Sequence, residues 1–499
     1  MKSRTICSGV LLAAMLLAAV SCGETETQPE ANVGSEAAET AVETEAAPAY
    51  LDSLSEELDF GGAEIKFLSY YAAEGDGENS AIFPDDTTDV VNAAFAKRTQ
   101  ELEDRLNVVI RKNPLADYSK LVPTVTASVS AGDHDYDIVM MHTALHIALC
   151  ADKKLYDLSE LESFDFSKSY WSSDYINKVN IGDKIYIVGG DATLSFIRGM
   201  MVTYVNNAVW NQVLPDDNIY DIVKSGKWTV DNVHTYAKDC YQDVNNDGLK
   251  DKDDTLGLVM ANGSWDNALF LSLGGRLTEN DSKSVTITVG SEHNVAVMEK
   301  LTKLFVDSTY AMETDTNDTQ TPLKMLTENR ALFLFDYLVR AESTDMRNMK
   351  ADFSVVPPPK FDEAQQNYMT ALPDGITGIC MPVSLSAEDA ERNAAVLEAF
   401  VSMTSQSVIP VYYDLVLKNK YTRDPQAAEM IDLIHDSIVA DFGIYWGYSS
   451  YLSGMTGLVY EQMKSGKGAD AFLSACAKNE KRWNKEIVKL LDKFMDEEK

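Results

Sequence analysis

Oxygen-bearing side chains recur at nearly every second position in the stretch DVNNDGLKDKDD, between residues 243 and 254. Read as a twelve-residue calcium loop, the stretch has glycine at position six, where the chain must turn sharply. The six ligand positions are filled by Asp243, Asn245, Asp247, Leu249 (through its backbone carbonyl), Asp251 and Asp254. Carboxylates gathered in one turn would repel one another strongly without a cation. The spacing therefore predicts a bound Ca²⁺, and the alternative is a solvated acidic turn that binds nothing tightly.

Two departures from the calcium-loop pattern limit the role of this ion. Position twelve is Asp254 rather than glutamate, which makes bidentate ligation less secure. The segment TLGLVMA, which follows the loop, has the pattern of a strand, so the loop does not join two helices as in a calcium sensor. We therefore expect a structural clamp and no part in chemistry.

A second group of residues is suited to a sugar, which presents hydroxyls at its edge and C–H groups on its faces. The segment SWDNALF places Trp265 beside Asp266, a flat ring next to a hydrogen-bond acceptor. The segment GIYWGY places Tyr445 and Trp446 between glycines, as in a loop at the lip of a cleft. Each of these rings could instead be packed inside the protein without touching a ligand.

Four further candidates lie where predicted strands end. Tyr70 and Tyr71 end the first predicted strand, AEIKFLSYY. Asp191 follows two glycines after the strand GDKIYIV, and Asp336 ends the strand ALFLF. Ligands bind near strand ends in α/β proteins, but an aspartate there can equally cap a turn.

The histidines and acids form no recognisable catalytic motif. His142 and His146 lie four residues apart, as in a zinc-binding helix, but the glutamate of HExxH is missing between them. A glycosidase needs two facing carboxylates roughly 5–10 Å apart, and no short motif among the 78 acidic residues proposes such a pair. GxSxG, phosphate-loop and GxGxxG motifs are also absent from the sequence. We therefore expect a binding protein and not an enzyme.

The N-terminus predicts export and a lipid anchor. Residues 1–21 have an early basic pair, a short apolar run and small residues before Cys22, the pattern of a secretory signal. The sequence AVSC resembles the lipobox of bacterial lipoproteins, in which the cysteine is lipidated; an ordinary secreted protein is the alternative. Residues 22–50 contain seven glutamates and no basic residue, so they predict a disordered tether. We expect the chain at the cell membrane, facing outside the cytoplasm, at the cell surface or in the periplasm.

The net charge and the cysteine spacing exclude several classes of partner and of site. The formal net charge of −35 disfavours nucleic acid and anionic lipid head groups as partners. Beyond the N-terminal segment four cysteines are scattered without a CxxC pair, which disfavours a zinc or redox motif. They are Cys150, Cys240, Cys380 and Cys476. Two disulfides would allow three pairings, and we expect mostly buried free thiols.

The remaining chain predicts an α/β protein of two lobes. About 450 residues follow the tether, more than one hydrophobic core usually serves. The first strand is followed by an amphipathic helix with Phe95, Leu102 and Leu106 on one stripe, and then by the strand NVVI. YDIVMM is a continuous apolar strand of the kind buried in a parallel sheet. This order predicts ligand space at the carboxyl ends of the strands.

Four segments, in this order and spacing, carry a resemblance to a known family. They are YDIVMMHTALHIALCADKKLYDLSEL, KIYIVGGDATLSFIRGMMVTYVNNAVW, GKWTVDNVHTYAKDC and ALPDGITGICMPVS. Over about residues 55–499 the chain resembles the extracellular solute-binding proteins of family 1, the lipid-anchored receptors of ATP-driven importers for sugars or oligosaccharides. The second segment looks like the first crossing between lobes, and the last looks like the return crossing. An acidic loop leading into a strand also occurs in members of that family.

The resemblance implies a periplasmic-binding-protein-like fold, with two α/β lobes joined by hinge strands around an interlobe ligand cleft. The first lobe is expected to comprise 51–188 and 312–375, and the second 189–311 and 376–499. A monomer would then capture a carbohydrate and deliver it to ABC permease subunits. The alternatives are a surface glycan-binding or sensory lipoprotein of the same fold without a transporter, and, less favoured, a glycoside hydrolase.

Overall fold

The computed structural model describes most of the chain beyond the predicted tether. The described residues are 50–70, 82–84, 87–115, 117–281, 284–413 and 425–495. They belong to one compact unit, which spans Ala49–Lys499. The predicted signal peptide, the lipidated Cys22, the tether up to residue 49 and the candidate Tyr71 lie outside the described residues.

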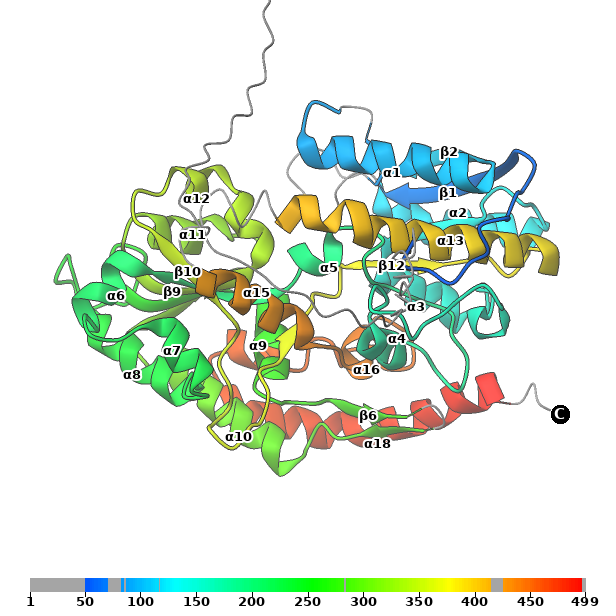
Figure 1. The fold of residues 1–499 in the computed structure, drawn as a ribbon. Helices are drawn as coiled ribbons and strands as arrows, with labels where there is room; N and C mark the ends of the chain where they lie inside the picture. The colour runs from blue at the N-terminus through cyan, green and yellow to red at the C-terminus, as the bar shows by residue number, and fades with distance from the viewer. Residues whose placement is uncertain are drawn as a thin grey trace, which may run out of the picture. The chain divides into compact units, whose positions relative to one another are not determined.

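The first sheet has the strand order β12-β3-β1-β2 (Figure 1). Its strands are β1 (Ala63–Tyr70), β2 (Val108–Leu115), β3 (Ile138–His142) and β12 (Thr377–Cys380). β1 runs parallel to β2 and β3, whereas β12 is antiparallel to β3. The helices of this lobe include α1 (Val90–Leu106), α2 (Leu121–Ala131), α3 (Thr143–Ala151) and α13 (Ala387–Ser407).

Helix α1 has the apolar face that the sequence predicts. Asp89 caps its first turn by accepting hydrogen bonds from the amides of Val91 and Asn92. Phe95, Leu102 and Leu106 are all fully buried, so the predicted apolar face is confirmed.

The second sheet has the order β10-β4-β9-β5-β8. Its strands are β4 (Met201–Asn206), β5 (Leu256–Ala261), β8 (Ala311–Thr314), β9 (Ala331–Tyr337) and β10 (Phe353–Val356). β5 runs parallel to β8 and β9, and β4 is antiparallel to β9 and β10. Every residue of β4, β5 and β9 is buried, as a strand covered on both faces requires.

The sheets correct the predicted distribution of the chain between the lobes. The segment 312–375 was assigned to the first lobe, but β9 and β10 pair within the second sheet. The segment 376–499 was assigned to the second lobe, but it begins with β12, which pairs with β3 in the first sheet. The assignment failed because buried strands of either sheet show the same continuous apolar pattern, which does not identify the pairing partner.

Further elements complete the two lobes. The remaining helices are α4 (Ser173–Val179), α5 (Ser195–Arg198), α6 (Asn207–Val213), α7 (Ile219–Lys224), α8 (Val230–Cys240), α9 (Ser264–Ser272), α10 (Glu292–Leu301), α11 (Gln320–Thr327), α12 (Thr344–Asn348), α15 (Pro425–Asp436), α16 (Phe442–Trp446), α17 (Tyr460–Lys464) and α18 (Gly468–Met495). β6 (Thr278–Asn280) and β7 (Val285–Ile287) form an antiparallel pair, and β11 (Thr370–Ala371) and β13 (Ile438–Val439) a parallel one. In Figure 1 the elements of the first sheet lie to the right and those of the second to the left, with α18 along the bottom.

The core explains two further features of the sequence. Within the described residues, one helix, Ala387–Tyr413, is apolar and long enough to cross a membrane, but 72% of its most apolar window is buried inside the protein. It is therefore a helix of the protein core.

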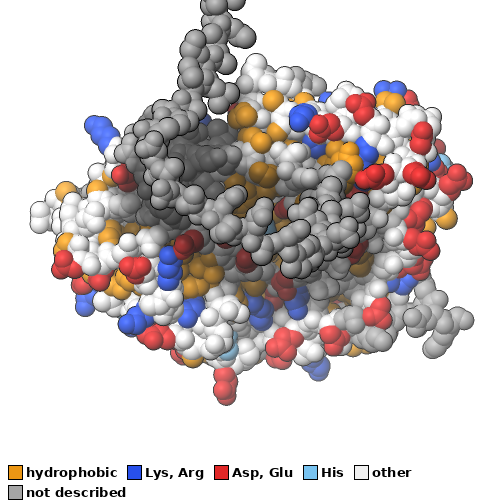
Figure 2. Space-filling model, viewed as in Figure 1, with side chains coloured by type: hydrophobic (Ala, Val, Ile, Leu, Met, Phe, Trp, Pro, Cys, Tyr) orange, Lys and Arg blue, Asp and Glu red, His pale blue; other side chains and the backbone are white. Residues whose placement is uncertain are grey.

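The four cysteines of the described chain are free and buried, which confirms the prediction of buried thiols. Figure 2 shows acidic side chains scattered over the visible face with basic ones between them, as the composition predicts.

Candidate ligand-binding site

Two parallel neighbours in the second sheet, β5 and β9, end at the same edge and carry the central residues of the candidate site. β5 leads through Gly263 into α9, where Trp265 is the second residue. Gly263 has a φ of +93°, a conformation that side chains other than glycine rarely adopt. Asp336 lies near the end of β9. The carboxyl ends of adjacent parallel strands thus bring together two residues that are 71 positions apart in the sequence.

A hydrogen-bond network fixes these two side chains. The indole Nε1 of Trp265 donates to Asp336 Oδ1 at 2.8 Å, and Arg340 Nε donates to Asp336 Oδ2 at 2.9 Å. The rings of Trp265 and Tyr337 have centroids 5.0 Å apart with an interplanar angle of 45°. Burial raises the pKa of Asp336, and Arg340 and the Trp265 N–H oppose that rise. The cluster offers an aromatic face, an anion and a guanidinium within one small volume.

The crossing segment between the lobes adds a second carboxylate to this cluster. Asp374 lies between β11 of one lobe and β12 of the other. Its Oδ1 accepts a hydrogen bond from Ser264 Oγ at 3.4 Å, and its Oδ2 accepts one from the hydroxyl of Tyr448. Burial raises the pKa of Asp374, opposed by the Ser264 hydroxyl. Tyr448 is 47% exposed, so this edge of the cluster meets solvent.

Asp266, predicted to contact a ligand, is used within the protein instead. It is buried and accepts a hydrogen bond from the backbone N–H of Gly263 at 2.8 Å, which fixes the start of α9. Its carboxyl is also bonded to that of Glu313, on β8. Burial raises the pKa of Glu313 to about 7 and that of Asp266 well above its ordinary value. The pair therefore holds a proton near neutral pH, because two buried carboxylates this close cannot both be charged.

The prediction that Tyr445 and Trp446 lie in a loop at the lip of a cleft is wrong. The segment forms the short helix α16, capped by the Asp441 side chain, and both rings are buried. Trp446 stacks on Phe442 at 5.1 Å between centroids, and its Nε1 donates to the carbonyl of Val179 at 2.8 Å. Its face and its N–H are thus already occupied, and it serves the core.

The other candidates lie apart from the Trp265 cluster or cannot be placed in it. Asp191 is nearly buried and accepts a hydrogen bond from Ser405 Oγ of α13 at 2.7 Å, so its carboxylate joins the crossing strand to a helix. Tyr70 ends β1 as predicted, but its side chain is outside the description, as is the whole of Tyr71.

The acidic loop 243–254 turns sharply at Gly248. Gly248 has a φ of +75°, as the sharp turn at position six requires. Asp254 is fully buried and its Oδ1 accepts from the amide of Val244 at 3.2 Å, closing the loop's ends on each other. Asp243 Oδ2 accepts from the amide of Gly248 at 3.0 Å, whereas Asp243 Oδ1 is buried without a hydrogen-bond partner.

The side chains of the loop do not point toward one common position, as the ligands of a metal ion would. In the described part of the chain, no three His, Cys, Asp or Glu side chains are grouped so that they could hold an ion. Asn245 and Asp247 instead accept hydrogen bonds from loop amides two residues on. The orphaned oxygen of Asp243, together with an amide oxygen at Asn245 and a carbonyl at Leu249, is a donor set of the hard oxygen type that Ca²⁺ takes.

Sequence reasoning did not select Arg340 as a site residue. A signal for Arg340 existed, because it lies four residues after Asp336 and the two side chains pair at that spacing. The contact between Asp374 and Tyr448 spans 74 residues and had no local signal.

Comparison with solved structures identifies the fold. No protein-family model matches the sequence, and no curated protein matches it. An ABC substrate-binding protein from Listeria monocytogenes in complex with cycloalternan is 14% identical, with a TM-score of 0.53 over 87% of this chain and 99% of that chain. UgpB from Mycobacterium tuberculosis in complex with glycerophosphocholine is 16% identical, with a TM-score of 0.54 over 87% and 100%. An ABC transporter solute-binding protein from Thermotoga lettingae bound with α-D-tagatose is 13% identical, with a TM-score of 0.52 over 86% and 100%.

Proposed function

We propose that this periplasmic-binding-protein-like chain of two α/β lobes is a lipid-anchored extracellular protein that captures a sugar or oligosaccharide and passes it to an ABC permease. The observation that carries the proposal is the cluster of Trp265, Asp336 and Arg340 at the carboxyl ends of β5 and β9, beside the crossing residue Asp374. In open α/β sheets this is the edge at which ligands bind.

The chemistry of the cluster supports a polyhydroxylated ligand. The Asp374 carboxylate accepts hydrogen bonds from hydroxyls, the Arg340 guanidinium, which Asp336 holds in place, donates to ring or hydroxyl oxygens, and the indole covers a C–H face. The three structural neighbours have different ligands: two are bound to saccharides, and UgpB is bound to glycerophosphocholine. The Asp374 carboxylate, at the edge of the cluster that meets solvent, favours the neutral, donor-rich saccharide, because it would repel a phosphodiester.

The proposed mechanism is binding without covalent change. The indole N–H of Trp265 and the guanidinium of Arg340 hold Asp336 in one orientation, so its carboxylate is positioned before a ligand arrives. Asp374 belongs to the segment that joins the lobes, so a ligand bound to both Asp374 and Asp336 would link lobe closure to capture. Release to a permease would reverse these contacts.

Calcium is proposed as a structural clamp of the loop 243–254. Asp243, Asn245, Asp247, Leu249, Asp251 and Asp254 would hold the ion. The loop joins α8 to β5, whose far end leads to Trp265. A bound ion would supply charge neutralisation in the loop, and the side chains would turn from the loop's amides toward it. The clamp would steady β5 without touching the ligand.

The test is a thermal-shift and calorimetric screen of residues 23–499 against mono- and oligosaccharides, with glycerophosphocholine as the competing ligand class. A saccharide that raises the melting temperature and returns unaltered by mass spectrometry supports the proposal. Release of reducing sugar from an oligosaccharide would indicate a hydrolase instead. Binding of glycerophosphocholine and of no saccharide would overturn the proposed ligand class.

A further inference from the structure

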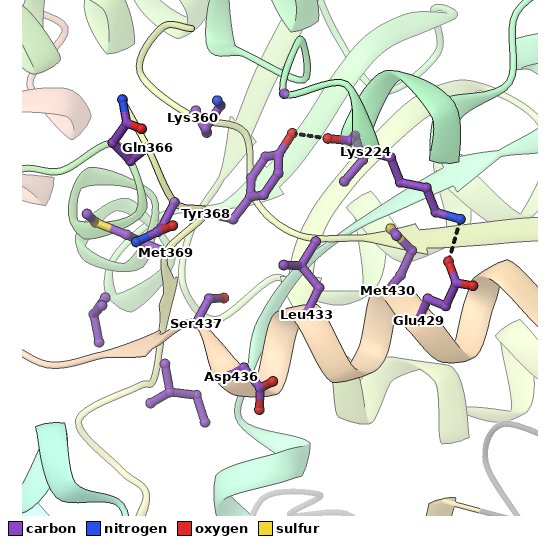
Figure 3. A pocket seen from close by; sticks show the side chains of 15 residues that line it. Lys224, Lys360, Gln366, Tyr368, Met369, Glu429, Met430, Leu433, Asp436 and Ser437 are labelled. Atoms are coloured by element: carbon purple, nitrogen blue, oxygen red, sulfur yellow. Dashed lines mark hydrogen bonds and ion pairs between the residues drawn. The ribbon is translucent and has the colours of Figure 1, made fainter. Parts of the chain in front are cut away.

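A pocket lined by none of the residues of the Trp265 cluster is shown in Figure 3. It has a volume of about 830 Å³ and is formed by α7, the segment 360–369 and α15 with β13. That volume is within the range of small-molecule sites. Most of its floor is apolar, with Val223, Met369, Met430, Leu433, Ile438 and Val439 among the lining residues.

One wall of this pocket carries a lysine whose side chain is nearly buried. Lys360 is only 4% exposed. Its ammonium lies 5.6 Å from the ring centroid of Tyr368 and against Gly226, where an added Cβ would sit 3.2 Å from Nζ. Within the described residues this ammonium forms no ion pair and donates no hydrogen bond, and its Nζ is not one of the buried polar atoms left without a partner. The ammonium therefore meets the open space of the pocket, where it can pair with an anion.

The other polar groups of the pocket already have partners. Lys224 forms an ion pair with Glu429 at the rim, visible in Figure 3. The Tyr368 hydroxyl donates to the carbonyl of Val223 at 2.8 Å, and the Ser437 hydroxyl is bonded to Thr370 at 2.9 Å. Asp436 has a side chain that is 82% exposed and lies 3.5 Å from His435 Nδ1, so its charge is screened by water.

We propose that this pocket is a binding site for a small apolar molecule that carries one anionic group, a carboxylate, sulfonate or phosphate. The anionic group pairs with the Lys360 ammonium, and the apolar body covers Met430 and Leu433. Glu429 and Asp436 also line the pocket, but Glu429 pairs with Lys224 and the Asp436 side chain is exposed to water, so Lys360 is the cation left for a ligand. The two sites stand on different residues, so either can hold if the other fails.

The probe for this site is anilinonaphthalene sulfonate, whose fluorescence rises when its apolar rings leave water. Its uncharged analogue, phenylnaphthylamine, separates the anionic group from the apolar body. We expect the wild-type chain to bind the sulfonate at one site, and Lys360→Met to weaken that binding at least tenfold while leaving phenylnaphthylamine within twofold. Lys360→Arg should restore most of the affinity for the sulfonate.

Two control variants make the result decisive. Lys464→Met removes a cation that pairs with Asp315 and does not line this pocket, and Trp265→Ala alters the proposed saccharide site; both should leave sulfonate binding within twofold. The melting temperature of Lys360→Met should stay close to that of the wild type, which shows that a loss of sulfonate binding is not a loss of the fold. Equal sulfonate affinity in wild type and Lys360→Met, loss of binding in Trp265→Ala, or no binding by the wild type would each overturn the proposal.

Discussion

The indole N–H of Trp265 and the Oδ1 atom of Asp336 are joined by a hydrogen bond of 2.8 Å, although the two residues come from different strand ends. Asp336 is 2% exposed and Trp265 9% exposed. The bond therefore fixes the ring and the carboxylate relative to each other at the edge of the sheet, and the proposed site is organised around it.

Loss of the charge on Asp336 should weaken ligand binding more than it weakens the fold. Asp336→Asn keeps an acceptor for the Trp265 N–H but leaves Arg340 without its anion. We expect saccharide affinity to fall at least tenfold, which is about 1.4 kcal/mol, by calorimetry. Glu342→Gln is the matched control, because Glu342 pairs with Arg198 outside the cluster and should leave affinity unchanged. Equal losses in both variants would contradict a specific role for Asp336.

Variants of Trp446 and Trp265 should distinguish an effect on stability from an effect on saccharide binding. Trp446→Ala removes a fully buried ring and should cost about 3–5 kcal/mol in the free energy of unfolding, measured with urea. Its saccharide affinity should stay within twofold of wild type. Trp265→Ala should instead lose affinity tenfold or more, beyond any loss of stability that removal of its ring causes. A Trp446 variant that lost affinity while keeping its stability would show that α16 contacts the ligand.

The carboxyl pair of Asp266 and Glu313 predicts a pH dependence of stability. The pKa of Glu313 is raised from 4.5 to about 7, so the folded chain binds more protons than the unfolded chain between these values. This stabilisation is fully present below pH 4.5 and is lost as the pH rises through 7. Glu313→Gln should remove it, with a change on the order of 2 kcal/mol between pH 5 and 7.5.

Urea unfolding at the two pH values measures this difference. Glu292→Gln, at an exposed position at the start of α10, is the control and should keep the wild-type pH dependence. A Glu313→Gln variant with an unchanged pH profile would show that the pair carries no proton.

Removal of calcium should lower stability and spare recognition. We expect a chelator to lower the melting temperature of the wild type, and excess Ca²⁺ to restore it. Asp243→Asn should abolish this response, whereas Asp307→Asn, at an exposed position outside the loop, should keep it. Loss of saccharide binding on chelation, with the fold intact, would show that the ion belongs to the recognition site.

The sequence predicted local structure better than long-range arrangement. The α1 stripe and the turn at Gly248 follow from spacing and from the φ that glycine allows. The placement of β9 and β12 failed because strand pairing depends on residues far apart in the chain. Trp446 was misplaced because glycines on either side of an aromatic pair suit a loop and a tightly packed helix alike.

For the candidate site too, the sequence predicts which residues are suited to a ligand but not the contacts they make. Trp265 and Asp336 could be selected because each follows or ends a recognisable strand, but their hydrogen bond could not be foreseen. Asp266 has the same residue type and neighbourhood as a ligand acceptor, and only its burial and its bond to Glu313 show otherwise.

Small-angle scattering during a saccharide titration tests the central claim most directly. If the two lobes close on a ligand held between Asp336 and Asp374, the radius of gyration of the wild type must fall with saturation, and Trp265→Ala must require a higher saccharide concentration for the same change. A radius of gyration that stays constant while calorimetry shows the ligand bound would contradict capture by closure.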